Sequence, residues 1–172
     1  MRKSVTGFTI VELLIVVVVI AILATISIVA YSGIQSRAKH TQQVAEVDRI
    51  GRAIQLWIAE NGKPLGQSGH GYNGMGYGNF SSANTGAYPP VSVEEMLRNS
   101  GHLTGTLNVN SGYMLAPCTL YTEERWVVLT TMNPAPPISV TDQITQSSCT
   151  NSLLTTYTSE DYSYRKNYLK VY

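Results

Sequence analysis

Residues 7–26 read GFTIVELLIVVVVIAILATI, and this stretch decides the architecture of the chain. The apolar run extends from Phe8 to Ala30, a span of 23 residues. Its polar members are Thr9, Glu12, Thr25 and Ser27. A helix of this length would span roughly 34 Å, and the hydrocarbon core of a membrane is about 30 Å thick. The stretch therefore predicts a transmembrane helix.

The flanking charges predict how this helix is oriented. Arg2 and Lys3 precede it with no acidic residue beside them, so the positive-inside rule places the N-terminus in the cytoplasm and the remainder outside. Two alternatives fit the segment less well. A cleaved secretory signal would have a shorter apolar run, and a cut before Tyr31 would put Ile28 where a small residue is needed. A core helix of a soluble protein would need burial on every side.

Glu12 is the residue in this run that needs an explanation. An acidic residue at the centre of a membrane helix costs about 2.5 to 3.5 kcal/mol on insertion scales, and less near an end. The helix dipole favours a negative charge near the helix N-terminus, typically by about 0.3 to 1 kcal/mol. This gain is smaller than the cost of placing the carboxylate in the membrane. Glu12 is therefore expected to have a cationic partner and a function.

The stretch closely resembles the class III signal and N-terminal segment of type IV pilins and of the related pseudopilins of type II secretion. The resemblance implies cleavage between Gly7 and Phe8 by a membrane aspartic peptidase, the prepilin peptidase. It further implies N-methylation of the new N-terminal residue Phe8 and participation of Glu12 in filament assembly. Many members carry a proline within this helix, whereas this chain has none between Phe8 and Asn61, so Gly33 is the comparable weak point.

Helix geometry gives these implied roles a physical rationale. Residues i and i+4 lie on one helix face, so the amine created on Phe8 and the carboxylate of Glu12 would be neighbours. In the family, the compensating cation is the amine of an adjoining subunit. A buried charge pair of this kind would favour one axial offset between neighbouring helices. The sequence leaves open whether the partner is the chain's own amine or a neighbour's.

Residues 31–61 are predicted to continue the same helix with one apolar face. Asn61, Gly62 and Pro64 provide the stop signal. The apolar stripe at helical spacing is Val44, Val47, Ile50, Ile54, Trp57 and Ile58. Such a stripe predicts packing against a globular head.

Residues 62–91 are glycine-rich and predict a long loop without helix or strand. The glycines do not form a phosphate-binding loop, because no Gly-Lys-Ser/Thr end and no preceding strand accompany them. An exposed variable loop is favoured over a binding surface; the candidate residues for such a surface are His70, Tyr72, Met75 and Tyr77.

Residues 92–172 predict a β-rich head with a short helix at 92–100, where Ser92 and Glu95 form a capping box. Three β-prone segments follow: Tyr113–Leu115, Thr119–Thr122 and Arg125–Met132, the last two read as a hairpin. The segment Leu153–Tyr172 is also β-prone, and residues 167–172 predict a final strand. An antiparallel sheet packed on the outer half of the long helix gives the α+β class, which the family resemblance also implies.

The two cysteines, Cys118 and Cys149, lie in the part predicted to leave the cytoplasm, where a disulfide is favoured over two buried thiols. The bond would close a loop of about thirty residues and contribute on the order of 3 to 4 kcal/mol. This loop contains the proline-rich segment 133–142, NPAPPISVTD, for which little regular structure is expected.

No catalytic motif is present, so the chain is not expected to be an enzyme. His40, His70 and His102 lack partners at metal-ligand spacing, and no cofactor or metal is expected. Asp142, Glu160 and Asp161 are a weak calcium candidate, for which solvated surface is favoured. A small basic cluster near the end makes DNA a minor candidate partner; its members are Tyr164, Arg165, Lys166, Tyr168 and Lys170.

The sequence as a whole predicts the structural subunit of a type IV pilus-like filament: a single-pass precursor in the cytoplasmic membrane that later joins an extracellular pilus. The expected partners are further copies or related subunits, the prepilin peptidase, the assembly machinery, membrane lipid, and DNA or surfaces. Removal of Arg2 and Lys3 leaves 10 basic against 11 acidic residues, a formal charge of −1 that permits close lateral packing. A pseudopilin and a singly anchored adhesion domain are the alternatives. The expected segments are 1–7 (leader), 8–30 (apolar helix), 31–61 (amphipathic helix), 62–91 (loop) and 92–172 (head).

Overall fold

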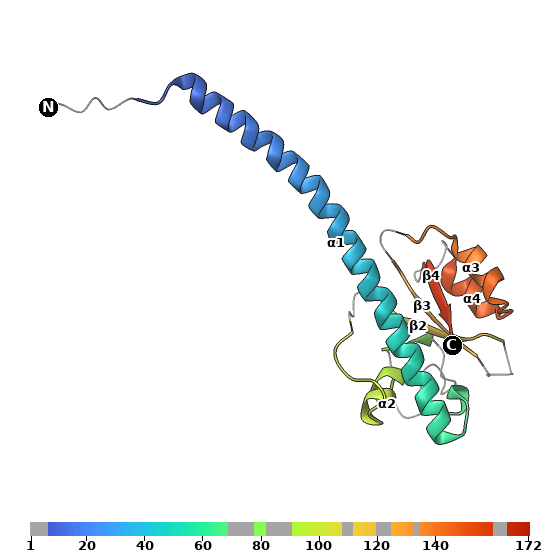
Figure 1. Ribbon diagram of the computed structural model, residues 1–172. Coiled ribbons are helices and arrows are strands. Elements are labelled where there is room, and N and C mark those ends of the chain that lie inside the picture. Colours follow the sequence, from blue (N-terminus) through green and yellow to red (C-terminus); the bar gives the residue numbers. More distant parts are fainter. Residues whose placement is uncertain are drawn as a thin grey trace. The chain divides into compact units, whose positions relative to one another are not determined.

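The computed structural model describes residues 7–68, 78–81, 91–107, 112–119, 125–132, 135–159 and 165–172. The chain divides into two compact units, Met1–Lys39 and His40–Tyr172. One helix, α1 (Ile10–Asn61), passes from the first unit into the second (Figure 1). It remains helical through Gly33, the weak point that the sequence offers.

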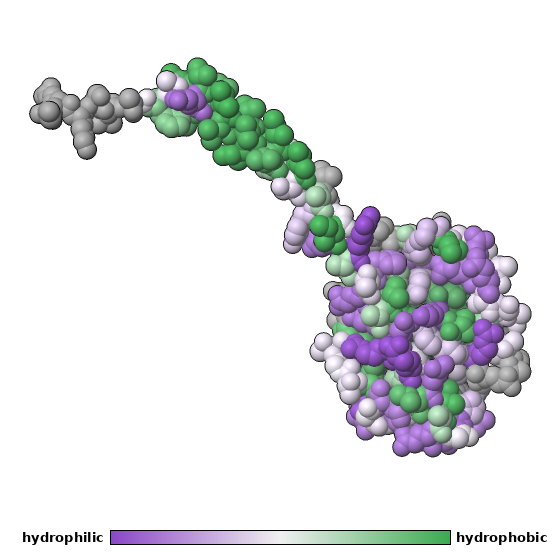
Figure 2. Space-filling model, in the orientation of Figure 1, coloured by the Kyte–Doolittle hydropathy of each residue, from purple (hydrophilic) through white to green (hydrophobic). Residues whose placement is uncertain are grey.

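The first unit contains the apolar part of α1, whose described side chains are exposed. Every large apolar side chain between Phe8 and Ile28 that the structure describes is at least 47% exposed. Figure 2 shows this part of the helix as a nearly continuous hydrophobic surface. Within the described residues, α1 is the helix long and apolar enough to cross a membrane. Such a surface needs lipid or other subunits to cover it.

The second unit is built on a four-stranded antiparallel sheet of order β1-β2-β3-β4. The strands are β1 (Gly78–Asn79), β2 (Met114–Pro117), β3 (Trp126–Thr130) and β4 (Tyr168–Val171). Met114 is opposite Leu129, and Leu129 is in turn opposite Leu169. All residues of β2 and β3 are buried, because both faces of the sheet are covered.

The C-terminal part of α1 covers one face of the sheet. Val47, Ile50 and Ile54 are fully buried there, and they pack in one cluster with Leu115, Trp126 and Val128 of the sheet. Helix α2 (Val93–Asn99) and the short 3-10 helix η1 (Leu65–Gln67) add Met96, Leu97 and Leu65 to this cluster. The predicted apolar stripe and the predicted α+β class are both confirmed.

Two short helices, α3 (Val140–Ser147) and α4 (Ser152–Thr158), belong to the cluster on the other face. Because strand side chains alternate, this face carries Met114, Ala116, Val127 and Leu129. Leu154 and Tyr157 of α4 are buried in the same cluster, and Val140 and Ile144 of α3 pack against it.

Hydrogen bonds cap the C-terminus of α1 and the N-terminus of α2 in the way that their sequences indicate. Gly62 follows α1 with φ +61°, and its N–H donates to the carbonyl of Ile58 at 2.9 Å. Ser92 caps α2 by accepting a hydrogen bond from the Glu95 N–H at 3.1 Å. Helix α2 therefore begins where the capping box places it, and ends one residue before the expected 100.

Four expectations are wrong, three for the head and one for the loop that precedes it. The first strand of the hairpin is Met114–Pro117 rather than Thr119–Thr122: Thr119 is not in a strand, and residues 120–122 lie outside the described residues. The buried side chains of Met114–Pro117 favour sheet, whereas the threonine-rich segment has no comparable apolar content. Gly78 and Asn79 form a strand within the stretch expected to be loop, because they pair with Leu115 and Met114 of β2.

The other two errors are helices in segments expected to be strand or irregular. Residues 153–158 belong to α4, whose N-cap Asn151 accepts a hydrogen bond from the Leu153 N–H at 2.9 Å. Burial of Leu154 and Tyr157 on one side of that helix outweighs the β-propensity of its threonines. Residues 140–142 belong to α3, for which Ser139 accepts a hydrogen bond from the Asp142 N–H at 3.2 Å.

Candidate functional site

The predicted cleavage site lies immediately before α1 and is open. Gly7 and Phe8 precede the first helical residue, Ile10, and the Phe8 side chain is 76% exposed. Nothing lies within 4 Å of the position that a Cβ on Gly7 would occupy. The Gly7–Phe8 peptide bond is therefore not enclosed by other parts of the described chain.

Glu12 forms a capping box with Thr9 at the start of α1. Its Oε2 accepts hydrogen bonds from the Thr9 N–H at 2.9 Å and from the Thr9 hydroxyl at 2.7 Å. In return, the Glu12 N–H donates to Thr9 Oγ1 at 3.2 Å. This reciprocal arrangement satisfies donors that the first turn of a helix otherwise leaves unpaired.

Both hydrogen bonds from Thr9 to the carboxylate go to the same oxygen of Glu12. Its second oxygen, Oε1, has no hydrogen bond within the described chain, and the described residues of α1 around it are exposed. A carboxylate in this state retains acceptor capacity for a further donor. Sequence reasoning predicted the importance of Glu12 but missed its cap, although the Thr-x-x-Glu pattern of residues 9–12 signals it.

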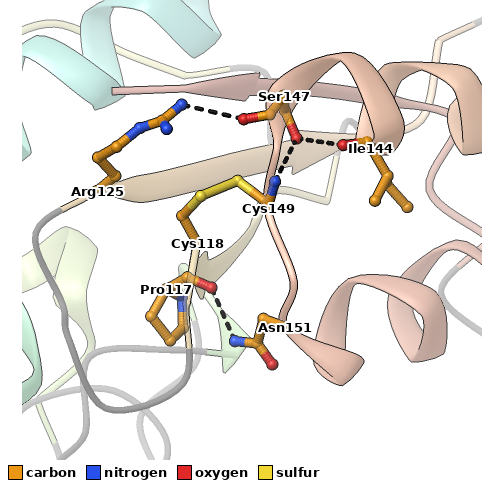
Figure 3. Close-up of a disulfide and its surroundings, with 7 residues drawn as sticks. All are labelled: Pro117, Cys118, Arg125, Ile144, Ser147, Cys149 and Asn151. Carbon is orange, nitrogen blue, oxygen red and sulfur yellow. Dashed lines mark hydrogen bonds between the residues drawn. A yellow bond between two sulfur atoms is a disulfide. The ribbon is translucent and has the colours of Figure 1, made fainter.

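The two cysteines form the expected disulfide, with Cα atoms 4.7 Å apart and a sequence separation of 31 residues (Figure 3). Cys118 directly follows β2, and Cys149 lies between α3 and α4. Hydrogen bonds on either side reinforce the link: Asn151 Nδ2 donates to the Pro117 carbonyl at 2.7 Å, and Arg125 donates to the Ser147 carbonyl at 3.2 Å. The bond thus fastens the short helices to the end of β2.

A cluster of three side chains, called here the Asp48 cluster, joins α1 to the end of the sheet. Lys170 Nζ and the Tyr172 hydroxyl each donate to Asp48 Oδ1 at 2.6 Å. Burial by itself would raise the pKa of Asp48, but the hydrogen bonds from Lys170 and Tyr172, together with the positive charges of Lys170 and Arg52, hold it below its usual value. Burial and the hydrogen bond to Asp48 raise the pKa of Tyr172.

The remaining members of the predicted basic cluster are not gathered into one exposed patch. Lys170 is paired within the Asp48 cluster. Lys166 is only 7% exposed, and its burial lowers the pKa of its amine. Arg165 is exposed, and Tyr164 lies outside the described residues. Of the three cations on which the DNA hypothesis rests, two are therefore committed to the interior or to an internal ion pair.

Among the histidine and calcium candidates, His102 and Asp142 each contact another residue of the described chain. His102 Nε2 lies 2.7 Å from Glu60 Oε2, an internal contact of the head, and His70 lies outside the described residues. Asp142 contacts the Ser139 hydroxyl at 2.7 Å, while Glu160 and Asp161 also lie outside. Among the residues that the structure describes, no group of three or more His, Cys, Asp or Glu side chains could hold a metal ion.

Comparison with known proteins points to the same N-terminal segment. The family described as "Prokaryotic N-terminal methylation motif" matches residues 2–28. The chain is also similar to the type IV major fimbrial protein FimA of Dichelobacter nodosus, with 29% identity over 150 residues, 77% of this chain and 92% of the relative. No solved structure matches.

The similarity to FimA extends well beyond the 27 residues of the motif and into the head. The chain has the expected architecture, a long N-terminal helix with an antiparallel sheet packed against its C-terminal part. The methylation motif, the similarity to a fimbrial protein and this architecture together support the assignment of the chain to the type IV pilin family.

Proposed function

We propose that this chain is a prepilin that is cleaved between Gly7 and Phe8, methylated on the Phe8 amine, and polymerised into an extracellular filament through α1. The observation that carries the proposal is the combination, in one segment, of the methylation motif with an apolar helix surface that is exposed within the described residues. Before assembly, membrane lipid covers that surface. In the filament, other subunits cover it.

Glu12 is the proposed assembly residue. The cap on Oε2 fixes the carboxylate at the first turn, while Oε1 remains open to a cation. The amine of Phe8 on a neighbouring subunit is a cation of suitable charge, and it exists only after cleavage. Pairing between them would compensate a charge that is costly in an apolar environment, and would set the axial offset between subunits.

Processing is tested by mass spectrometry of the N-terminal peptide of the mature protein. The proposal requires a peptide that begins at Phe8 and carries one methyl group on its amine. A Gly7→Leu variant should remain uncleaved in the membrane, whereas Gly33→Leu, at a helical glycine whose Cβ position is equally open, should be processed normally. An intact Gly7–Phe8 bond in the mature wild-type protein would exclude the proposed processing.

Assembly is tested with Glu12→Ala and Glu12→Gln. Both variants should be processed but should not appear in sheared surface filaments, because neither carries the charge that pairs with the incoming amine. Thr25→Ala is a matched control, since it also removes a polar group from the apolar run, where the Thr25 hydroxyl donates to the Ile22 carbonyl. Normal filament yield from both Glu12 variants would contradict the registry role.

Electron microscopy with a tagged subunit separates this proposal from its alternatives. Long external fibres that carry the tag support a pilin. Short fibres confined to the periplasm would instead assign the chain to a secretion pseudopilin, and the absence of fibres would indicate a singly anchored domain. The cleavage and methylation experiments do not separate the first two classes, because both share the N-terminal motif.

A further inference from the structure

Strand β4 lies at one edge of the sheet, and the hydrogen-bond pattern identifies which of its backbone groups face outward. Trp126 and Tyr172 exchange both of their backbone hydrogen bonds, at 2.9 and 2.8 Å. Because bonded and non-bonded pairs alternate in an antiparallel ladder, the N–H and C=O groups of Leu169 and Val171 point away from β3. Such an edge is a template on which another strand can pair.

One side chain occupies part of this edge. Gln143 of α3 accepts a hydrogen bond from the Leu169 N–H through Oε1 at 3.0 Å. Its Nε2 donates to the Asn167 carbonyl at 3.0 Å and to the Ile138 carbonyl at 2.9 Å. A side-chain amide thus makes one bond to β4 and one to the residue before it, as the N–H and C=O of one residue in a fifth strand would.

The orientation of this amide is determined by its partners. If the Gln143 oxygen and nitrogen exchanged places, the nitrogen would face the Leu169 N–H and the oxygen would face two carbonyls, so all three contacts would become repulsive. The position therefore requires an amide with its acceptor toward Leu169. Neither an apolar residue nor a residue that only donates meets that requirement.

We propose that Gln143 is an edge plug: its amide takes the place of a fifth strand, limits the sheet to four strands, and keeps the β4 edges of two heads from pairing. The opposite edge strand, β1, has only two residues and offers little template. The plug covers the Asn167 carbonyl and the Leu169 N–H. The N–H of Val171 is the next outward donor along the strand, and no hydrogen bond to it is present within the described chain.

The first test is residue-resolved amide hydrogen exchange on the full chain in detergent micelles. In the wild type, the Leu169 amide should be protected although it faces outward, and that of Val171 should not. Gln143→Ala and Gln143→Met should each speed exchange at Leu169 about tenfold, since a hydrogen bond of typical strength is lost. Gln146→Ala, which removes an exposed glutamine from the same helix, should leave Leu169 unchanged.

The methionine variant separates the hydrogen bond from packing, because methionine keeps the length of the side chain but lacks the amide. Retained protection of Leu169 in Gln143→Met would overturn the proposal. Unchanged tryptophan fluorescence in the variants would show that the head remains folded, because Trp57 and Trp126 are both buried in its core.

The second test measures self-association by sedimentation in the same micelles. Gln143→Ala should form dimers at concentrations where the wild type and Gln146→Ala carry one chain per micelle. Adding Val171→Pro should restore the single-chain state, because proline removes an outward N–H that the pairing edge requires. Dimers that persist in the double variant, or a Gln143→Ala protein that stays monomeric, would contradict the proposed role.

Discussion

Substitution of Gly51 by alanine tests the packing of the Asp48 cluster, because its effect on stability should change sign with the residue at position 172. An added Cβ at Gly51 would lie 2.3 to 2.4 Å from three ring atoms of Tyr172. No real contact is that short, so the ring must move. The Tyr172 hydroxyl would then lose its 2.6 Å hydrogen bond to Asp48.

The two opposing contributions can be estimated. A hydrogen bond to a charged group contributes about 1.5 to 3 kcal/mol, and the Asp48 side chain is 25% exposed, which favours the lower part of that range. Alanine is better than glycine in a helix interior by about 0.8 to 1.0 kcal/mol. Gly51→Ala should therefore destabilise the wild type by roughly 1 kcal/mol.

In a Tyr172→Ala background the ring is absent, and the same substitution should stabilise the head by about 0.8 to 1.0 kcal/mol. Tyr172→Phe is the matched control, since it keeps the colliding ring and removes only the hydroxyl. Urea unfolding of the full chain in detergent, followed by the fluorescence of the two buried tryptophans, measures all three backgrounds. Equal destabilisation by Gly51→Ala with and without the ring would refute the reasoning.

Three further changes test other parts of the head. Replacing Cys118 and Cys149 together by serine should lower the free energy of unfolding by about 3 to 4 kcal/mol in urea titrations, because the cross-link over 31 residues is lost. An unchanged urea midpoint would show that the disulfide does not stabilise the fold. Ser92→Ala should cost about 1 kcal/mol in the same assay by removing the cap of α2, and Ser100→Ala, at its other end, should cost less. Because the pKa of Asp48 is lowered in the folded state, its contribution to stability is present above the ordinary aspartate pKa of about 3.9 and is lost as the pH falls through the folded pKa. Asp48→Asn should therefore lower the free energy of unfolding at pH 7 and reduce the loss of stability on acidification. A pH profile of stability identical to that of the wild type would argue against the cluster.

The long helix and its two halves could be predicted because their signals are local. The apolar run needs no partner to be recognised, and the stripe from Val47 to Trp57 follows the helical period. Helix α2 was predicted with a boundary error of one residue because Ser92 and Glu95 are three residues apart. The disulfide could be predicted because the chain has only two cysteines.

The rest of the head depends on contacts that a single sequence does not display. Leu154 and Tyr157 form a helix face only because the second face of the sheet is there to receive them. Gly78 and Asn79 have no strand signal, and they pair because β2 offers an open edge. Gln143 and Tyr172 lie in segments without a recognisable motif, and their roles come from partners 26 and 124 residues distant in sequence.

The cap on Glu12 also bears on how subunits would come apart. Thr9 and Glu12 both lie after the predicted cut, so the bonds between them can form in the precursor, in the mature subunit and in any filament. A neighbouring amine at Oε1 would meet a carboxylate that two hydrogen bonds from Thr9 already hold in place. After withdrawal of that amine, Glu12 would still be hydrogen-bonded to Thr9 through Oε2. If subunits assemble as proposed, the cap would therefore offset part of the cost of an unpaired Glu12 carboxylate both before assembly and after release.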